Sequence, residues 1–312
     1  MDVVTIDFET YYDKDYSLSK MTTEEYIRDP RFQTVGVAVK VNDGETDWYS
    51  GKDTAGFLNA IDYSDKAILA HNTAFDGAIL SWRYGIKPKF WFDTLSMARP
   101  IHAMSVGGSL KALTTYYGLG QKGDEVLRTL GMRREDFTPE QMQAYAEYCV
   151  QDVELTYKLF RELSREFPPS ELLVIDQTLR MYTEPKLELD ALVLDNHLVT
   201  IQERKAKLLD RLGGEEKAKK YLMSNAKFAG LLRALGVEPP VKVSKTTGKE
   251  AFAFAKTDIA FTSLLDHPNA SVRAVVEARL GTKSTIEETR TQRFLGVAER
   301  GRLPIMLNYY GA

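Results

Sequence analysis

The start of the chain constrains the fold most, because its side chains alternate strictly between apolar and polar. Val4, Ile6 and Phe8 fall on one face of an extended segment. Asp7 and Glu9 fall on the opposite face, so both acids point in the same direction. The pattern predicts a strand with one apolar face and one acidic face.

Further strand signals follow along the first half of the chain. Residues 34–41 are a β-branched run, separated from residues 46–49 by Asp43-Gly44, a typical hairpin turn. Residues 66–70 form a short apolar run that predicts a buried strand. These strands alternate with helix signals, which favours a layered α/β fold.

The helices of the first half are marked by their ends. Asn72 is placed to cap a helix that stops before Gly85. Gly108-Ser109 opens a second, short helix. Thr138 begins a capping box with proline at the first helical position, and the pattern predicts a helix from there through Phe160.

A Pro168-Pro169 pair then interrupts the chain, and we place a domain boundary there, between residues 1–168 and 169–312. The 312 residues, of which 44% are hydrophobic, suffice for two domains. The second domain is expected to be mainly helical. Its predicted helices are residues 171–182, 196–212 and 272–300, and a polar, basic loop or ribbon spans residues 242–254.

Charge divides unevenly between the two parts. Residues 1–168 carry 19 basic and 26 acidic side chains, a net charge of −7, and the remainder carries 22 and 18, a net charge of +4. An acidic domain can hold cations, and a basic one can lie along phosphates. Ordinary variation of surface charge is the alternative.

Composition disfavours several classes of protein. The single cysteine, Cys149, cannot form an internal disulfide or a thiolate zinc cluster, which fits a reducing compartment. The N-terminus lacks the pattern of a signal peptide, and no stretch reaches the roughly 20 apolar residues of a membrane span. We expect a soluble, cytoplasmic protein with no membrane partner.

Three segments carry polar side chains in positions suited to chemistry. Asp7 and Glu9 share a strand face, where burial is costly unless a cation neutralises them. Asp76 falls on the first turn of a helix after a strand, at the edge where ligands of α/β sheets gather. Tyr148 and Asp152 are four residues apart on one helix face. Taken singly, each segment also has an ordinary structural explanation. Asp7, Glu9 and Asp152 could be solvated acids. Asp76 could only favour the helix dipole, and Tyr148 could be an aromatic at the boundary of the core.

Together the three segments supply four carboxylates and a phenol. Oxygen ligands of this kind suit Mg²⁺ or Mn²⁺ better than zinc. Two such ions roughly 4 Å apart can stabilise the attacking and leaving oxygens of a phosphodiester. The set therefore indicates a metal site for phosphodiester hydrolysis.

The segments read Asp-Phe-Glu-Thr, Asn-x-x-x-Asp and Tyr-x-x-x-Asp, in that order. This arrangement resembles the tyrosine-bearing branch of the DEDD exonuclease superfamily, which includes the proofreading domains of family A and family B DNA polymerases and the RNase D group. The resemblance implies an RNase H-like fold with a mixed central sheet. It also implies two divalent metal ions, Mg²⁺ or Mn²⁺, as cofactors.

The resemblance gives each motif residue a role. Asp7, Glu9 and Asp152 would hold one metal ion, with Asp7 bridging to the second. Asp76 would act on the second ion, partly through water. Tyr148 would orient the attacking water or hydroxide, whose pKa the metal lowers.

Residues beside the motif receive separate predictions. Four of them sit where such domains grip the terminal nucleotide, by hydrogen bonds and by aromatic wedging or stacking. The four are Phe8, Thr10, Asn72 and Phe75. His71 is expected to pack or hydrogen-bond near the strand end, and Asp93 to cap a helix or lie at the surface. Cys149 is expected to be a buried thiol rather than a nucleophile.

Beyond the proline pair, the chain is similar to bacterial and phage family A DNA polymerases. The matching segments, which follow the family's order, include residues 187–190, 224–228, 245–249, 301–304 and 307–312. The resemblance implies a mainly α-helical, thumb-like domain that ends at the start of the polymerase palm. The palm aspartates and the fingers have no counterpart here, so we expect no polymerase activity from this chain alone.

A basic helical thumb suits sequence-independent contact with the phosphates of duplex DNA. Several of its basic side chains could equally be solvated faces of amphipathic helices. The residues predicted to contact DNA are Lys205, Lys207, Arg211, Lys217, Lys220, Lys245 and Lys249.

The sequence thus predicts a 3′→5′ proofreading-type DNA exonuclease that releases nucleoside 5′-monophosphates from single-stranded or frayed ends. Its partners would be DNA and the missing palm and fingers, in a bacterial or phage-infected cell. An RNA-trimming exonuclease of the RNase D type has the same chemistry and stays open as an alternative. A non-catalytic DNA-binding module is the second alternative, which the intact carboxylates disfavour.

Overall fold

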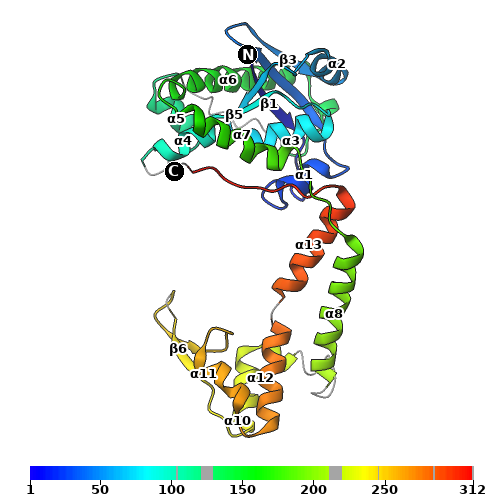
Figure 1. The fold of residues 1–312 in the computed structure, drawn as a ribbon, viewed down its shortest axis with the longest axis vertical. Coiled ribbons are helices and arrows are strands. Elements are labelled where there is room, and N and C mark those ends of the chain that lie inside the picture. Colours follow the sequence, from blue (N-terminus) through cyan, green and yellow to red (C-terminus); the bar gives the residue numbers. More distant parts are fainter. Residues whose placement is uncertain (103–104, 121–128, 211–219, 245, 284, 311–312) are drawn as a thin grey trace. The chain divides into compact units, whose positions relative to one another are not determined.

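The computed structural model describes the chain except for residues 103–104, 121–128, 211–219, 245, 284 and 311–312 (Figure 1). The chain divides into two compact units, Met1–Leu187 with Arg302–Ala312 and Glu188–Gly301. Each unit has a hydrophobic core of its own. The larger unit contains all the residues predicted to bind metal.

The larger unit is built on a mixed five-stranded sheet. Its strands are β1 (Val3–Thr10), β2 (Thr34–Val41), β3 (Thr46–Ser50), β4 (Ala67–Ala70) and β5 (Phe90–Asp93). They lie in the order β3-β2-β1-β4-β5, with β1, β4 and β5 parallel and the pairs β1-β2 and β2-β3 antiparallel. This sheet confirms the expected α/β class and the mixed central sheet.

Strand alternation at the start of the chain has the expected effect. Val4, Ile6 and Phe8 are buried on one face of β1. The β2–β3 hairpin turns at Asp43-Gly44, in agreement with the sequence pattern. Strand β5 lies outside the predicted strands, and its three consecutive aromatic residues show no alternation of apolar and polar side chains.

Helices cover both faces of the sheet. Those of the larger unit are α1 (Thr23–Arg28), α2 (Lys52–Ala60), α3 (Thr73–Arg83), α4 (Thr94–His102), α5 (Leu110–Tyr116), α6 (Pro139–Leu163) and α7 (Pro169–Thr183), with a 3₁₀ turn at Arg134–Asp136. Cys149 on α6 contacts Asp7, whereas Tyr84, just after α3, stacks on Phe8. Because neighbouring strand residues point to opposite faces, α6 and α3 lie on opposite sides of β1 (Figure 1).

The start of α6 confirms the capping box. Thr138 Oγ1 accepts a hydrogen bond from Gln141 N (3.2 Å), and the Gln141 side chain accepts one from Thr138 N (2.9 Å). Pro139 occupies the first helical position, where its missing N–H costs no helical hydrogen bond. The helix continues past the predicted Phe160 to Leu163.

The larger unit extends beyond the boundary predicted at Pro168-Pro169, because α7 packs against β5 and α3. Asp176 on α7 accepts a hydrogen bond from Trp91 N (2.8 Å). Trp82 Nε1 on α3 donates to Thr183 O (3.0 Å). The proline pair therefore marks the start of a helix, and the division by contacts falls after that helix.

The smaller unit is mainly helical. Its elements are α8 (Ala191–Asp210), α10 (Asn225–Ala234), β6 (Val241–Val243), β7 (Glu250–Phe252), α11 (Ile259–Thr262), a 3₁₀ turn at Ser263–Asp266, α12 (Ala270–Lys283) and α13 (Ile286–Arg300). Strands β6 and β7 pair antiparallel, so the polar segment forms a ribbon. The core of this unit gathers Phe228, Phe254, Phe261, Val272 and Val276.

The single helix predicted over residues 272–300 is wrong, because α12 and α13 are separate helices. Thr285 stands between them at the N-cap position of α13. Its side chain makes no cap hydrogen bond, but its branched Cβ gives threonine a low helix propensity, which favours a break at this position. Helix α8 begins earlier than predicted, since Asp190 Oδ1 accepts a hydrogen bond from Val193 N (3.0 Å) and caps its first turn.

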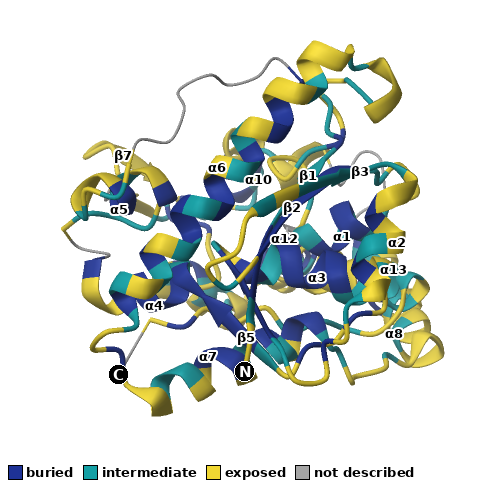
Figure 2. Cartoon of the chain, turned by 90° about the horizontal axis from the view of Figure 1, so that it is seen from above, coloured by how far each residue is buried: buried dark blue, intermediate teal, exposed yellow. Residues whose placement is uncertain are grey.

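The extent to which each residue is buried agrees with this arrangement of strands and helices (Figure 2). Strand β4 is buried along its whole length, as a central parallel strand with helices on both sides must be. Helix α8 is mostly exposed, and Ile201 and Leu209 are its buried residues. Among the residues that the structure describes, no helix combines the length and apolar character needed to cross a membrane.

Candidate active site

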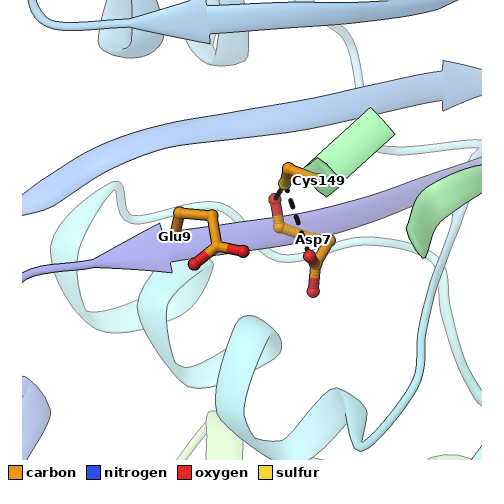
Figure 3. Close-up of side chains that lie close together, drawn as sticks. All are labelled: Asp7, Glu9 and Cys149. Atoms are coloured by element: carbon orange, nitrogen blue, oxygen red, sulfur yellow. Dashed lines mark hydrogen bonds between the residues drawn. The ribbon is translucent and has the colours of Figure 1, made fainter. Parts of the chain in front are cut away.

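Asp7 and Glu9 lie near the carboxyl end of β1, on the face that α6 covers (Figure 3). The Cys149 thiol of α6 donates to Asp7 Oδ2 (3.3 Å) and to Asp7 O (3.2 Å). Pairing of β1 with β2 shifts register between Glu9 and Thr10. Such irregularities bend a strand locally and are common beside functional sites, because they re-aim the adjacent side chains.

Asp76 reaches the same strand from the first turn of α3. Its Oδ1 accepts a hydrogen bond from Phe8 N (3.0 Å), on the backbone between the two strand acids. Burial and the negative charge of Asp7 raise the pKa of Asp76 well above its ordinary value, and Glu9 adds to the rise. The structure thus brings three predicted carboxylates together at one end of β1.

Helix α6 carries the other two motif residues. Tyr148 is half-buried and Asp152 is buried. Asp152 follows Tyr148 by four positions and Cys149 by three, so it shares their side of the helix. Because Cys149 touches Asp7, this side of α6 faces β1.

Tyr145 was not among the predicted site residues, yet its Oη donates a hydrogen bond to Glu9 Oε2 (2.6 Å). Burial and the negative charge of Glu9 raise the pKa of Tyr145, so the hydroxyl keeps its proton. In the sequence, Tyr145 belongs to the apolar side of the helix, because Cys149 and Val153 follow it at spacings of four. Its position three residues before Tyr148, on the same helix face, was the signal that could have identified it.

The donor set fits a divalent cation. Ligand atoms of Asp7, Glu9 and Cys149 all lie within 4.8 Å of one another. A cation among these carboxylates would remove the repulsion that raises the pKa of Asp76. Burial and Asp7 raise the pKa of Cys149 well above its ordinary value, so the thiol acts as a hydrogen-bond donor. The oxygen donors that remain suit Mg²⁺ or Mn²⁺.

The sequence profile of the 3′-5′ exonuclease family matches residues 6–168, which is more than half of the chain. The chain belongs to the 3′-5′ exonuclease family. The matched segment contains the five motif residues of this exonuclease and ends at the predicted domain boundary. A comparison with curated proteins found no match.

Solved structures similar to this exonuclease include nucleases and a polymerase. Brucella melitensis NrnC with bound Mg²⁺ is 17% identical, with a TM-score of 0.42 over 57% of this chain and 81% of that chain. Trypanosoma brucei RNase D in a GMP complex is 16% identical, with a TM-score of 0.45 over 58% of this chain and 57% of that one.

The third structure is the POL domain of Pol1 from M. smegmatis in complex with a DNA primer-template and dNTP. It is 16% identical, with a TM-score of 0.54 over 97% of this chain and 48% of that chain. The similarity therefore extends over both units of the exonuclease chain. It shows a shared fold, in which the RNase H-like exonuclease unit is followed by a mainly helical region.

The loop before α3 of the exonuclease differs from its prediction. Asn72 occupies the N-cap position with a left-handed backbone (φ +74°), but its side chain is exposed and makes no cap hydrogen bond. Asp93 caps instead, because its Oδ1 accepts from Asn72 N (2.8 Å) and Thr73 N (3.2 Å). The same carboxylate accepts from Leu95 N and Ser96 N (both 3.2 Å), so one buried acid caps α3 and α4.

The other predicted nucleotide contacts lie in different surroundings. The ring of Phe8 is buried and stacks on Tyr84, with centroids 5.9 Å apart, so its assignment to the nucleotide is corrected to the core. Strand alternation is the reason, since it turns this ring away from the acids. The Thr10 hydroxyl shares a hydrogen bond with the Tyr26 hydroxyl (2.8 Å), and Phe75 is half-buried on α3.

His71 has the structural role expected from the sequence. Its Nε2 donates to Gly108 O (2.9 Å), and its Nδ1 lies 2.9 Å from Thr94 Oγ1. Because a carbonyl can only accept, Nε2 carries a proton. Both ring nitrogens are thereby engaged in joining the ends of β4 and β5 to the loop before α5.

In the smaller unit, Lys205 departs from its predicted role. It forms an ion pair with Glu288 between α8 and α13, and only 15% of its side chain is exposed. Its charge is therefore neutralised by an ion pair within the unit rather than available to bind phosphate. Three of the other predicted residues are exposed, and three lie outside the described part of the chain. The exposed residues are Lys207, Lys220 and Lys249; the undescribed ones are Arg211, Lys217 and Lys245.

Proposed function

We propose that this chain is a metal-dependent 3′→5′ exonuclease that acts on DNA and releases nucleoside 5′-monophosphates. The observation that carries the proposal is the close approach of Asp7 and Glu9 near the carboxyl end of β1, with Asp76 bound to the backbone N–H of Phe8 between them. A buried acid whose pKa is raised by a neighbouring acid is typical of a functional site that binds a cation. Membership of the exonuclease family supports this chemistry.

In this proposal Asp7, Glu9 and Asp152 hold one Mg²⁺ or Mn²⁺, and Asp76 serves a second ion. Bound divalent ions of this kind lower the pKa of the attacking water and stabilise the charge of the phosphate during displacement. The hydrogen bond from Phe8 N holds Asp76 in place beforehand, which reduces the cost of assembling the site. Tyr148 would orient the attacking water through its hydroxyl.

DNA is the proposed substrate because the fold similarity to a polymerase domain that holds a DNA primer-template spans both units. The exposed lysines of the smaller unit would add phosphate contacts that weaken with salt. The chain spans about half of that polymerase chain (48%), and the activity proposed for it is hydrolysis. A family A palm and fingers are the proposed partners of this chain.

Digestion of a 5′-labelled single-stranded DNA oligomer in Mg²⁺ or Mn²⁺ tests the proposal. We expect products that shorten from the 3′ end and disappear with EDTA. Asp7→Ala should slow cleavage by about 100-fold or more, because even outer partners of metal ligands contribute 10- to 100-fold. Asp65→Ala is the matched control, since the Asp65 side chain is 72% exposed and pairs with Lys66 on the surface.

An RNA oligomer of the same sequence distinguishes the substrates. Faster cleavage of RNA than of DNA would favour the RNase D-type alternative. DNA binding by a folded wild type without metal-dependent cleavage would contradict the catalytic proposal and favour a binding module. Equal cleavage by wild type and Asp7→Ala would remove Asp7 from the reaction.

A further inference from the structure

Helix α6 presents two donors outside the sequence motif to the two acids of β1. Tyr145 Oη donates to Glu9 Oε2 at 2.6 Å, the short distance typical of a hydroxyl bonded to a carboxylate. One turn later, the Cys149 thiol donates to Asp7 Oδ2 at 3.3 Å (Figure 3). The same helix face therefore contacts both strand acids.

Packing fixes the position of the Tyr145 hydroxyl. The ring is 4% exposed and stacks on Phe137, with centroids 5.3 Å apart and planes 12° from parallel. Trp48 of β3 lies edge-on to it, at a centroid distance of 6.4 Å. A side chain held from two sides has few rotamers left to lose, so its hydrogen bond is formed at low entropic cost.

Trp48 in turn depends on a glycine in the neighbouring strand. Gly36 on β2 is the direct partner of Glu9 on β1. A Cβ atom at Gly36 would lie 2.1 Å from the Trp48 indole, so the indole occupies the space that a side chain would take. Gly36, Trp48 and Tyr145 thus form a continuous support that ends on the Glu9 carboxylate.

We propose that Tyr145 is a positioning residue, which holds the Glu9 carboxylate in the orientation that binds a divalent cation, and that Cys149 does the same for Asp7. This inference rests on the proposed function. A carboxylate that is already oriented pays less entropy when it binds metal, and partners of ligands typically change metal affinity by about 10- to 100-fold. The ordinary alternative is that Tyr145 only fills the space between α6 and the sheet.

Tyr145→Phe distinguishes a positioning role from simple space filling, because it keeps the ring and removes the hydroxyl. Mn²⁺ binding to the purified chain, measured by isothermal titration calorimetry without DNA, gives a readout independent of cleavage. We expect the Mn²⁺ dissociation constant to rise about 10-fold. The metal concentration for half-maximal cleavage should rise in parallel, while KM for the DNA oligomer stays the same.

Tyr157→Phe is the matched control, since Tyr157 is a half-buried tyrosine on the same helix that lies over Lys40. It should leave Mn²⁺ affinity unchanged. In a Glu9→Gln background, Tyr145→Phe should have little further effect on Mn²⁺ affinity, because the bond that it breaks serves the Glu9 carboxylate. Cys149→Ser, which keeps a donor, should bind Mn²⁺ more tightly than Cys149→Ala.

Unchanged Mn²⁺ affinity in both Tyr145→Phe and Cys149→Ala would overturn the positioning role, even if the wild type cleaves DNA. An equal loss of affinity in Tyr145→Phe with and without Glu9→Gln would overturn it too, because the effect would then not act through Glu9. A wild type that neither binds Mn²⁺ nor cleaves DNA would overturn the proposed function together with this inference. If Tyr145→Phe does not fold, the comparison of Cys149→Ser with Cys149→Ala tests the positioning role instead.

Discussion

Asp76 and Asp93 are both 3% exposed, yet their surroundings give them different roles. Asp76 accepts a backbone hydrogen bond from Phe8 and is repelled by Asp7, which favours binding of a cation. Asp93 accepts hydrogen bonds from four backbone N–H groups at the starts of α3 and α4. A buried carboxylate is stabilised either by a counter-ion or by hydrogen-bond donors. The number of donors around each acid therefore indicates whether it needs a cation.

We predict that Asp93→Ala destabilises the larger unit by about 2–4 kcal/mol, because the starts of two helices lose their cap. Urea denaturation followed by circular dichroism measures the change. Asp65→Ala should change the free energy of unfolding by less than about 0.5 kcal/mol, as surface substitutions do. A loss below 1 kcal/mol in Asp93→Ala would contradict the capping role.

The packing of α6 on the sheet depends on the side chains that β2 and β3 carry. The indole of Trp48 on β3 lies over Gly36 of β2, and Tyr145 of α6 packs against that indole. The Lys40 ammonium on β2 also donates to Glu154 on α6 (2.7 Å) and to Gly44 O. An aromatic contact and a charged contact thus fix the same helix on the same pair of strands.

We predict that Gly36→Ala destabilises the chain by about 1–3 kcal/mol, the range for an overpacked site. The added methyl must displace Trp48, so Mn²⁺ affinity should fall as well. Gly56→Ala on α2 is the control, because no atom beyond the neighbouring helix backbone lies within 4 Å of its Cβ position and alanine favours a helix by about 0.5–1 kcal/mol. Calorimetry with and without Mn²⁺ measures both effects, and a Gly36→Ala protein as stable as wild type would disprove the close contact.

In the whole molecule, the proposed metal ligands and the exposed lysines predicted to contact DNA belong to different units. The core of the smaller unit centres on Phe228, which is fully buried between Phe254 and Phe261. The buried guanidinium of Arg279 lies 5.0 Å from the Phe228 ring centre, where the ring face stabilises its charge. Stability of this unit and metal binding by the other are therefore expected to respond to different substitutions.

We predict that Phe228→Ala destabilises the smaller unit by about 3–5 kcal/mol, through the cavity that it leaves. Mn²⁺ affinity should stay at the wild-type value, because every proposed ligand lies in the larger unit. Phe294→Ala on α13 is the matched control, since that ring is 40% exposed. Calorimetric unfolding and Mn²⁺ titration of each variant test this, and weaker Mn²⁺ binding by Phe228→Ala would contradict it.

Several elements of this fold are specified by local patterns in the sequence. Alternation fixed the two faces of β1, the Thr138 box fixed the start of α6, and Asp43-Gly44 fixed the hairpin. Such signals act within a few residues, so a linear chain contains them completely. The candidate acids could also be selected from the sequence, because their spacing on a strand or helix sets their direction.

The partner that each side chain contacts depends instead on how distant elements pack. The bond from Tyr145 to Glu9 joins residues 136 positions apart, and the cap of α3 comes from Asp93 on another strand. Lys205 is taken up by Glu288, and α7 joins the larger unit beyond the proline pair. Contacts of this kind form when separate elements pack, and periodicity along the chain contains no information about which elements will meet.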